Sequence, residues 1–83
     1  MTIKDIIHSA GSNLHTVIIT AREQDGTIET REAEPYSYRM TGGTEKFFCY
    51  DLRKHGTRNF LVSNIISVQE TQNSFTPRWP VEV

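Results

Sequence analysis

Three short segments decide the fold: REAEPY at residues 31–36, KFFCYD at residues 46–51 and RNFLVSNI at residues 58–65. Aromatic and β-branched residues, which favour strands, recur along them, and turn residues separate each segment from the next. The turns are Thr41-Gly42-Gly43 and His55-Gly56. This pattern predicts one strand over 45–51 and another over 57–62.

The flanking sequence predicts three more strands. Residues 14–21 are rich in β-branched and aliphatic side chains and precede Asp25-Gly26, a strong turn signal, so a hairpin should lead into a strand from residue 27. Pro35 interrupts that strand, and because proline cannot donate to a ladder it belongs at an edge or a bulge. A fifth strand is expected over 65–70. Together they predict a mainly β fold, a five-stranded antiparallel SH3-like or Sm-like barrel with a short N-terminal helix.

The N-terminal helix is expected over residues 3–10. Thr2 and Asp5 form a capping pattern, and an isoleucine stripe follows at helical spacing until Gly11 interrupts it. A helix this short is not stable alone in water, so the stripe should pack on the barrel, which we favour, or on a second subunit. One domain is therefore expected over 1–83, with the barrel at 14–70 and a packed tail at 71–83.

The tail is too apolar for a free linker. Phe75 and Trp79 are therefore expected to lie against the barrel. The alternative is that Trp79, beside Arg78, is an exposed anchor for a protein partner, because tryptophan and arginine dominate interface energetics.

Size and charge exclude several kinds of protein. The chain has 83 residues, and at that size folding hides roughly 60–65% of the surface of the unfolded chain, so the core must be small. A net charge of -1 argues against a protein that coats nucleic acid by bulk electrostatics. No apolar run approaches the roughly 20 residues that span a bilayer, and no signal peptide is recognisable, so a cytoplasmic protein without membrane contact is expected.

Cys49 is the single cysteine and is expected to be a buried, unreactive thiol.

Strand parity suggests where ligands could bind. Alternate residues of a strand share a face, so Phe47 and Cys49 should point one way and Phe48 and Tyr50 the other. By the same parity Arg58 shares a face with the aromatic residue at position 60. An arginine beside aromatic faces can receive a phosphate or a nucleotide base. The alternative is that the arginines form surface ion pairs with Glu32, Glu34 or Asp51, worth about 0–1 kcal/mol each.

Catalysis is not supported by the sequence. His8, His15 and His55 show no metal-ligand spacing among themselves or with Cys49. Ser63 lies in no nucleophile elbow, and no glycine-rich phosphate loop is present. We therefore expect a protein that is not an enzyme and needs no metal or organic cofactor.

The same segments resemble the WYL domain, a ligand-sensing module of bacterial transcription regulators with an Sm-like, SH3-type barrel. The resemblance runs from about residue 14 to residue 75. Its best parts are Arg31 with Glu34-Pro35, the pair Phe47-Phe48 where the family has Trp-Tyr-Leu, and Arg58-x-Phe60 followed by Ile65. It implies a stand-alone regulatory module. Because residues 1–13 hold one short helix at most, we expect no complete DNA-reading repressor in this chain.

The resemblance also implies which residues bind the ligand. Arg31 and Arg58 would contact an anionic group, Phe48 and Tyr50 would offer stacking surfaces, and Asn64 would make a polar contact. The implied ligand is a nucleotide or a short single-stranded nucleic acid. Asn64 stands where the family usually has arginine, so one expected cation is missing and an anion should bind less tightly than in a typical member.

The competing interpretation is a protein interaction or assembly module that has the same barrel and no small ligand. Exposed strand edges or the tail from Phe75 to Trp79 would then pair with a protein partner or with a second copy of the chain. The near-neutral charge and the missing cation at Asn64 favour this alternative.

Overall fold

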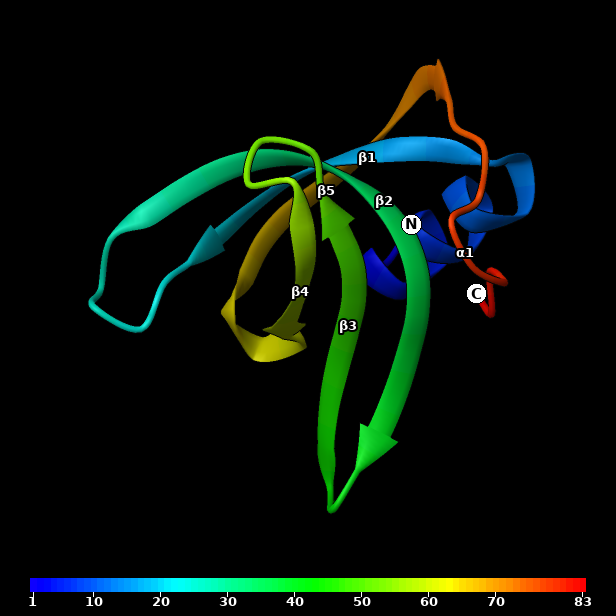
Figure 1. The fold of residues 1–83 in the computed structure, drawn as a ribbon. Coiled ribbons are helices and arrows are strands. Elements are labelled where there is room, and N and C mark those ends of the chain that lie inside the picture. Colours follow the sequence, from blue (N-terminus) through cyan, green and yellow to red (C-terminus); the bar gives the residue numbers. More distant parts are fainter.

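The computed structural model describes all 83 residues as one helix and five strands in a single antiparallel sheet (Figure 1). The elements are α1 (Ile3–Asn13), β1 (His15–Arg22), β2 (Ile28–Thr41), β3 (Thr44–Asp51), β4 (Gly56–Leu61) and β5 (Ile65–Ser74), with a 3-10 turn at Val62–Asn64. The strand order is β4-β3-β2-β1-β5. The predicted mainly β fold with five antiparallel strands and a short N-terminal helix is therefore confirmed. No helix has the length and apolar character needed to cross a membrane.

The long strand β2 gives the sheet its curl. Its first half pairs with β1 and its second half pairs with β3, and the register shifts between Pro35 and Ser37. This confirms the bulge predicted from Pro35, where the missing N–H does not disturb a continuous ladder. Figure 1 shows the sheet wrapping around itself, but no hydrogen-bonded ladder joins β4 to β5. The closed barrel therefore remains a prediction, and the observed sheet is curled with two free edges.

The core lies inside this curl and under α1. It contains eleven buried apolar side chains: Ile7, Ala10, Val17, Ile19, Ala21, Ala33, Phe47, Cys49, Phe60, Ile65 and Val68. Along β3, Phe47 and Cys49 are buried in this core, whereas Phe48 and Tyr50 point to the outer face and are half-buried. The expected division of the β3 side chains between two faces is confirmed.

Helix α1 is longer than the sequence predicts. Its start is as expected, because Thr2 and Asp5 exchange hydrogen bonds in a capping box. Gly11 does not end the helix, which continues to Asn13 and stops where Leu14 takes a left-handed conformation, with φ of 55°. A Cβ at Gly11 would collide with the side chain of Val83, so this glycine allows the C-terminal end of the chain to approach the helix.

The C-terminal tail crosses the outer face of the sheet. The Trp79 indole stacks on the Tyr36 ring with centroids 4.1 Å apart, and Phe75 meets the same ring edge-on at 5.7 Å. Arg78 lies over Tyr50, with its guanidinium carbon 3.8 Å from the ring centroid. Both predicted tail aromatics therefore contact the sheet, although the Trp79 residue retains 38% exposure.

A single carboxylate fastens α1 to the sheet. Glu70 of β5 accepts hydrogen bonds from Ser9 Oγ at 2.6 Å and from Asn13 Nδ2 at 2.9 Å, and it lies 2.7 Å from Nδ1 of His15. These contacts, with that of Asn13 the strongest, lower the pKa of Glu70 below its ordinary value of 4.5. The ionised carboxylate therefore favours the folded state.

Glu70→Gln should make the protein less stable at neutral pH and less sensitive to acid. Because the pKa of Glu70 is lower in the folded state, its ionised carboxylate stabilises the protein above pH 4.5. This contribution disappears as the pH falls below 4.5 through the pKa of the folded state. The variant lacks that titration, so its urea midpoint should fall less than the wild-type midpoint over the same acid range. Equal acid slopes in the two proteins would show that Glu70 is not linked to stability in this way.

Candidate functional site

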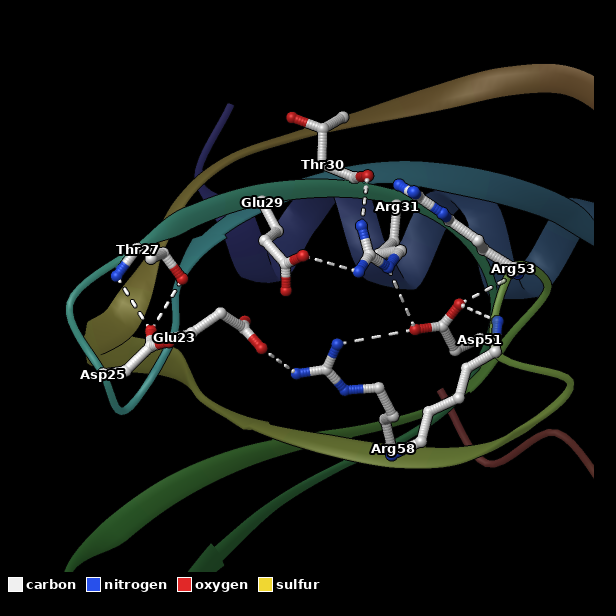
Figure 2. Close-up of polar contacts among 10 residues, drawn as sticks. Glu23, Asp25, Thr27, Glu29, Thr30, Arg31, Asp51, Arg53 and Arg58 are labelled. Atoms are coloured by element: carbon white, nitrogen blue, oxygen red, sulfur yellow. Dashed lines mark hydrogen bonds and ion pairs between the residues drawn. The ribbon is translucent and has the colours of Figure 1, made fainter.

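Arg31 and Arg58 converge on one buried carboxylate at the end of the curled sheet (Figure 2). Asp51 pairs with Ala33 of β2 on one side and with Gly56 of β4 on the other. Arg31 lies two residues before Ala33 on β2, and Arg58 lies two residues after Gly56 on β4. Because alternate residues of a strand share a face, both arginines lie on the inner face with Asp51. The register thus brings together two arginines that are 27 positions apart in the sequence.

Asp51 is fully buried, and both of its carboxylate oxygens are used. Oδ1 accepts hydrogen bonds from the backbone N–H groups of Arg53 and Lys54, at 2.9 and 3.0 Å. Oδ2 lies 3.6 Å from Nε of Arg31 and 3.5 Å from Nη1 of Arg58. The turn after β3 therefore fixes the carboxylate, and the carboxylate in turn orients both guanidinium groups.

The outer sides of the two guanidinium groups carry exposed or half-buried carboxylates. Glu23 accepts from Nη2 of Arg58 and Glu29 accepts from Nη2 of Arg31, both at 2.7 Å. The guanidinium of Arg58 also lies over the ring of Phe60, 4.4 Å from its centroid. Burial alone would lower the pKa of Arg58, but the hydrogen bonds and charges of Glu23 and Asp51 outweigh it and raise that pKa.

The cluster formed by Arg31, Arg58, Asp51, Glu23 and Glu29 carries a net charge of -1. Two arginines face three carboxylates, so the ion pairing that the sequence offered as an alternative does occur, with Asp51 as one partner. Glu34, the other buried candidate, pairs with Arg78 of the tail, at 3.0 Å. An incoming anion would therefore have to replace a carboxylate already bound to an arginine.

A hollow of about 450 Å³ opens beside Arg58. Its lining residues are Arg22, Glu23, Gln24, Asp25, Arg58, Asn59, Phe60, Leu61 and Asn64. Asn64, from the 3-10 turn, thus shares this hollow with Arg58, as the sequence prediction requires. Most of the lining is polar or charged, so the hollow suits a polar ligand rather than an apolar one.

Phe48 and Tyr50 lie away from this hollow. They face outward from β3, whereas Arg58 faces inward from β4. Phe48 lines a second hollow, of about 420 Å³, together with Trp79 and Arg58. Tyr50 lies under Arg78. The five sequence-predicted contact residues are therefore divided between sites. Arg58 lines both hollows, Asn64 lines the first and Phe48 the second, whereas Arg31 and Tyr50 line neither.

The sequence offered Asp51 only as a surface ion-pair partner of the arginines and did not single out Glu23. Asp51 carried a signal, because it follows Phe47 and Cys49 at a spacing of two and so occupies an inward position of β3. Glu23 carried none, because its approach to Arg58 depends on how the β1–β2 turn folds over the hollow. Cys49 is buried as expected, and burial, followed by the charge of Asp51, raises the pKa of its thiol to about 12.

The fold is similar to that of a known bacterial protein. Proteasome accessory factor B/C (PafBC) of Arthrobacter aurescens matches with a TM-score of 0.80 and 18% sequence identity. The match covers 93% of this chain and 13% of PafBC, so this chain spans a small part of that protein's length. The likeness shows that this chain and a part of PafBC share a fold. No family model matches the sequence, and no curated protein does.

Proposed function

We propose that this chain is a non-enzymatic regulatory module of the WYL type that binds a nucleotide-like or single-stranded nucleic-acid effector. The observation that carries the proposal is the pair Arg31 and Arg58, which Asp51 holds at one opening of the sheet. Guanidinium groups fixed in this way need little reordering to receive a phosphate by paired hydrogen bonds. The resemblance of the sequence to the WYL domain and the fold shared with a part of PafBC support the regulatory context.

The hollow beside Arg58 defines how an effector would bind. Its volume of about 450 Å³ is within the usual range for small-ligand sites, roughly 300–1,000 Å³. The phosphate would take the Nη2 edge of Arg58, and the amide of Asn64 could donate to or accept from the sugar or base. Phe48 and Tyr50 are not part of this binding mode, because they lie on the outer face.

Arg58→Gln should weaken binding of a fluorescein-labelled single-stranded oligonucleotide by roughly tenfold, the usual scale for one phosphate-binding arginine. Fluorescence anisotropy at several salt concentrations should also give a salt slope smaller by about one unit, because one phosphate contact is lost. The matched control is Lys46→Gln, which removes one positive charge near the start of β3, away from Asp51 at its end. It should change affinity less than twofold by the screening expected at physiological salt.

Two results would contradict the proposal. One is the absence of wild-type binding at low salt, where phosphate contacts are strongest. The other is an equal loss of affinity in Arg58→Gln and Lys46→Gln, because that pattern indicates general charge attraction rather than a site.

The second candidate function is a protein interaction or assembly module. It is favoured by the net negative charge of the arginine cluster and by the free edges of β4 and β5. Leu61 at one edge and Ile66 at the other are 39% and 50% exposed. Light scattering that shows a dimer over a micromolar concentration range, together with no oligonucleotide binding, would support this function over the first.

A further inference from the structure

Glu23 occupies the position on Arg58 that an anionic ligand needs. It follows β1 directly and reaches across to β4, where its Oε1 lies 2.7 Å from Nη2 of Arg58 (Figure 2). Both side chains are only 18% exposed, so this contact is better shielded from solvent than an ordinary surface ion pair. It also lies in the lining of the hollow, beside the open volume.

The turn that carries Glu23 holds its own shape. The N–H of Glu23 donates to Thr27 O at 2.7 Å, and the N–H of Gly26 donates to Glu23 O at 3.0 Å. Asp25 Oδ1 accepts from both the N–H and the hydroxyl of Thr27. Gly26 has φ of 89°, a conformation that glycine adopts without strain. The turn does not need Arg58 to stay folded, so the Glu23 side chain can leave without unfolding the hairpin.

The two carboxylates on Arg58 differ in how firmly they are held. Asp51 is fully buried and is fixed by two backbone N–H groups, so it cannot leave without disrupting the turn after β3. Glu23 has a single side-chain partner, Arg58. When Glu23 leaves, the cluster changes from a net charge of -1 to neutral, and the freed edge of Arg58 faces the hollow.

We propose that Glu23 is a built-in competitor that covers the anion-binding edge of Arg58 in the free protein and is displaced when a phosphate binds. This inference rests on the proposed function for the location of the phosphate. The internal carboxylate of Glu23 lowers the affinity of the site for anions, and anion binding releases the β1–β2 turn from its contact with Arg58. The effector signal would thus reach the protein surface at residues 23–27.

Glu23→Gln tests this competition directly. Glutamine has nearly the same size and can still accept from Arg58, but it lacks the charge that an incoming phosphate must displace. The matched control is Glu45→Gln, the same change of residue type at the start of β3. Glu45 does not line the hollow beside Arg58.

The ligand for this test is inorganic pyrophosphate. Its binding is followed by the NMR resonance of the Nε–H group of Arg58. Pyrophosphate should bind Glu23→Gln roughly five- to tenfold more tightly than the wild type, the scale of one charged hydrogen bond, and Glu45→Gln within twofold of the wild type. In the wild type, binding should also shift the amide resonances of residues 23–27. No gain in Glu23→Gln, an equal gain in Glu45→Gln, or no binding by any variant would overturn the inference.

The labelled oligonucleotide separates this inference from the proposed function. If pyrophosphate binding improves in Glu23→Gln but no variant binds the oligonucleotide, the competitor is supported and the nucleic-acid effector is wrong. If the oligonucleotide binds the wild type and Glu23→Gln equally, and pyrophosphate does too, the effector is supported and the competitor is wrong.

Discussion

Asp51→Ala is expected to lower the free energy of unfolding by about 3–5 kcal/mol, the cost of removing one partner from a buried charge network. Two guanidinium groups would lose their shared carboxylate while remaining largely shielded from water, since the side chains of Arg31 and Arg58 are only 15% and 18% exposed. The turn after β3 would also lose an acceptor for two backbone N–H groups. Equilibrium unfolding in urea, followed by far-UV circular dichroism, measures the change.

Two further variants separate the causes of this loss. Asp51→Asn retains an oxygen that can accept from the turn but lacks the charge, so its loss of stability should be smaller than that of Asp51→Ala. In the double variant Asp51→Ala with Arg58→Met, one unpaired charge disappears, and part of the lost stability should return. A loss of less than about 1 kcal/mol in Asp51→Ala would place this residue among ordinary surface ion pairs and would contradict the structural role assigned to it.

Much of the fold could be predicted because its determinants are local. The turn residues around Gly26, Gly42 and Gly56 separate the strands, and the side-chain period of two assigns Phe47 and Cys49 to the core. The bulge at Pro35 follows from the missing N–H of proline. These features depend on residues that are neighbours in the sequence, where propensity and parity are informative.

The arrangement around Arg58 could be predicted only in part, because it depends on contacts between distant segments. The sequence indicated Arg31, Arg58 and Asn64, and the structure places all three near one end of the sheet. The ion pair of Arg58 with Glu23 joins residues 35 positions apart, and no local pattern encodes it. The same limit applies to Gly11, where the sequence predicts the end of the helix. The residue that Gly11 contacts, Val83, lies at the other terminus of the chain.

Tyr36→Ala is the second substitution with a large expected effect, because Tyr36 joins the tail to the sheet. Its side chain is fully buried, with Trp79 stacked at 4.1 Å and Phe75 edge-on at 5.7 Å. Its hydroxyl donates to Glu34 at 2.7 Å and accepts from the N–H of Arg78 at 3.0 Å. Removing a buried aromatic side chain costs about 3–5 kcal/mol, and here the loss should also detach the tail.

Trp79 reports on the tail, because it is the only tryptophan of the chain. In Tyr36→Ala under native conditions its emission should shift to longer wavelength, while circular dichroism still shows a folded sheet at a lower urea midpoint. Tyr36→Phe preserves the ring and removes the hydroxyl, so it should keep the wild-type emission and lose about 1–3 kcal/mol, the cost of leaving buried partners unsatisfied. Unchanged emission in Tyr36→Ala would mean that other contacts hold the tail.

Tyr36 also tests whether the two faces of the sheet act independently. Its ring packs under the tail on the outer face, whereas Arg58 turns inward to Asp51 and Glu23. Tyr36→Phe should therefore lower stability and leave oligonucleotide affinity unchanged, whereas Arg58→Gln should lower that affinity. A loss of affinity in Tyr36→Phe would mean that the ligand contacts the outer face, where Phe48 and Tyr50 lie, and would return those two aromatics to the binding site.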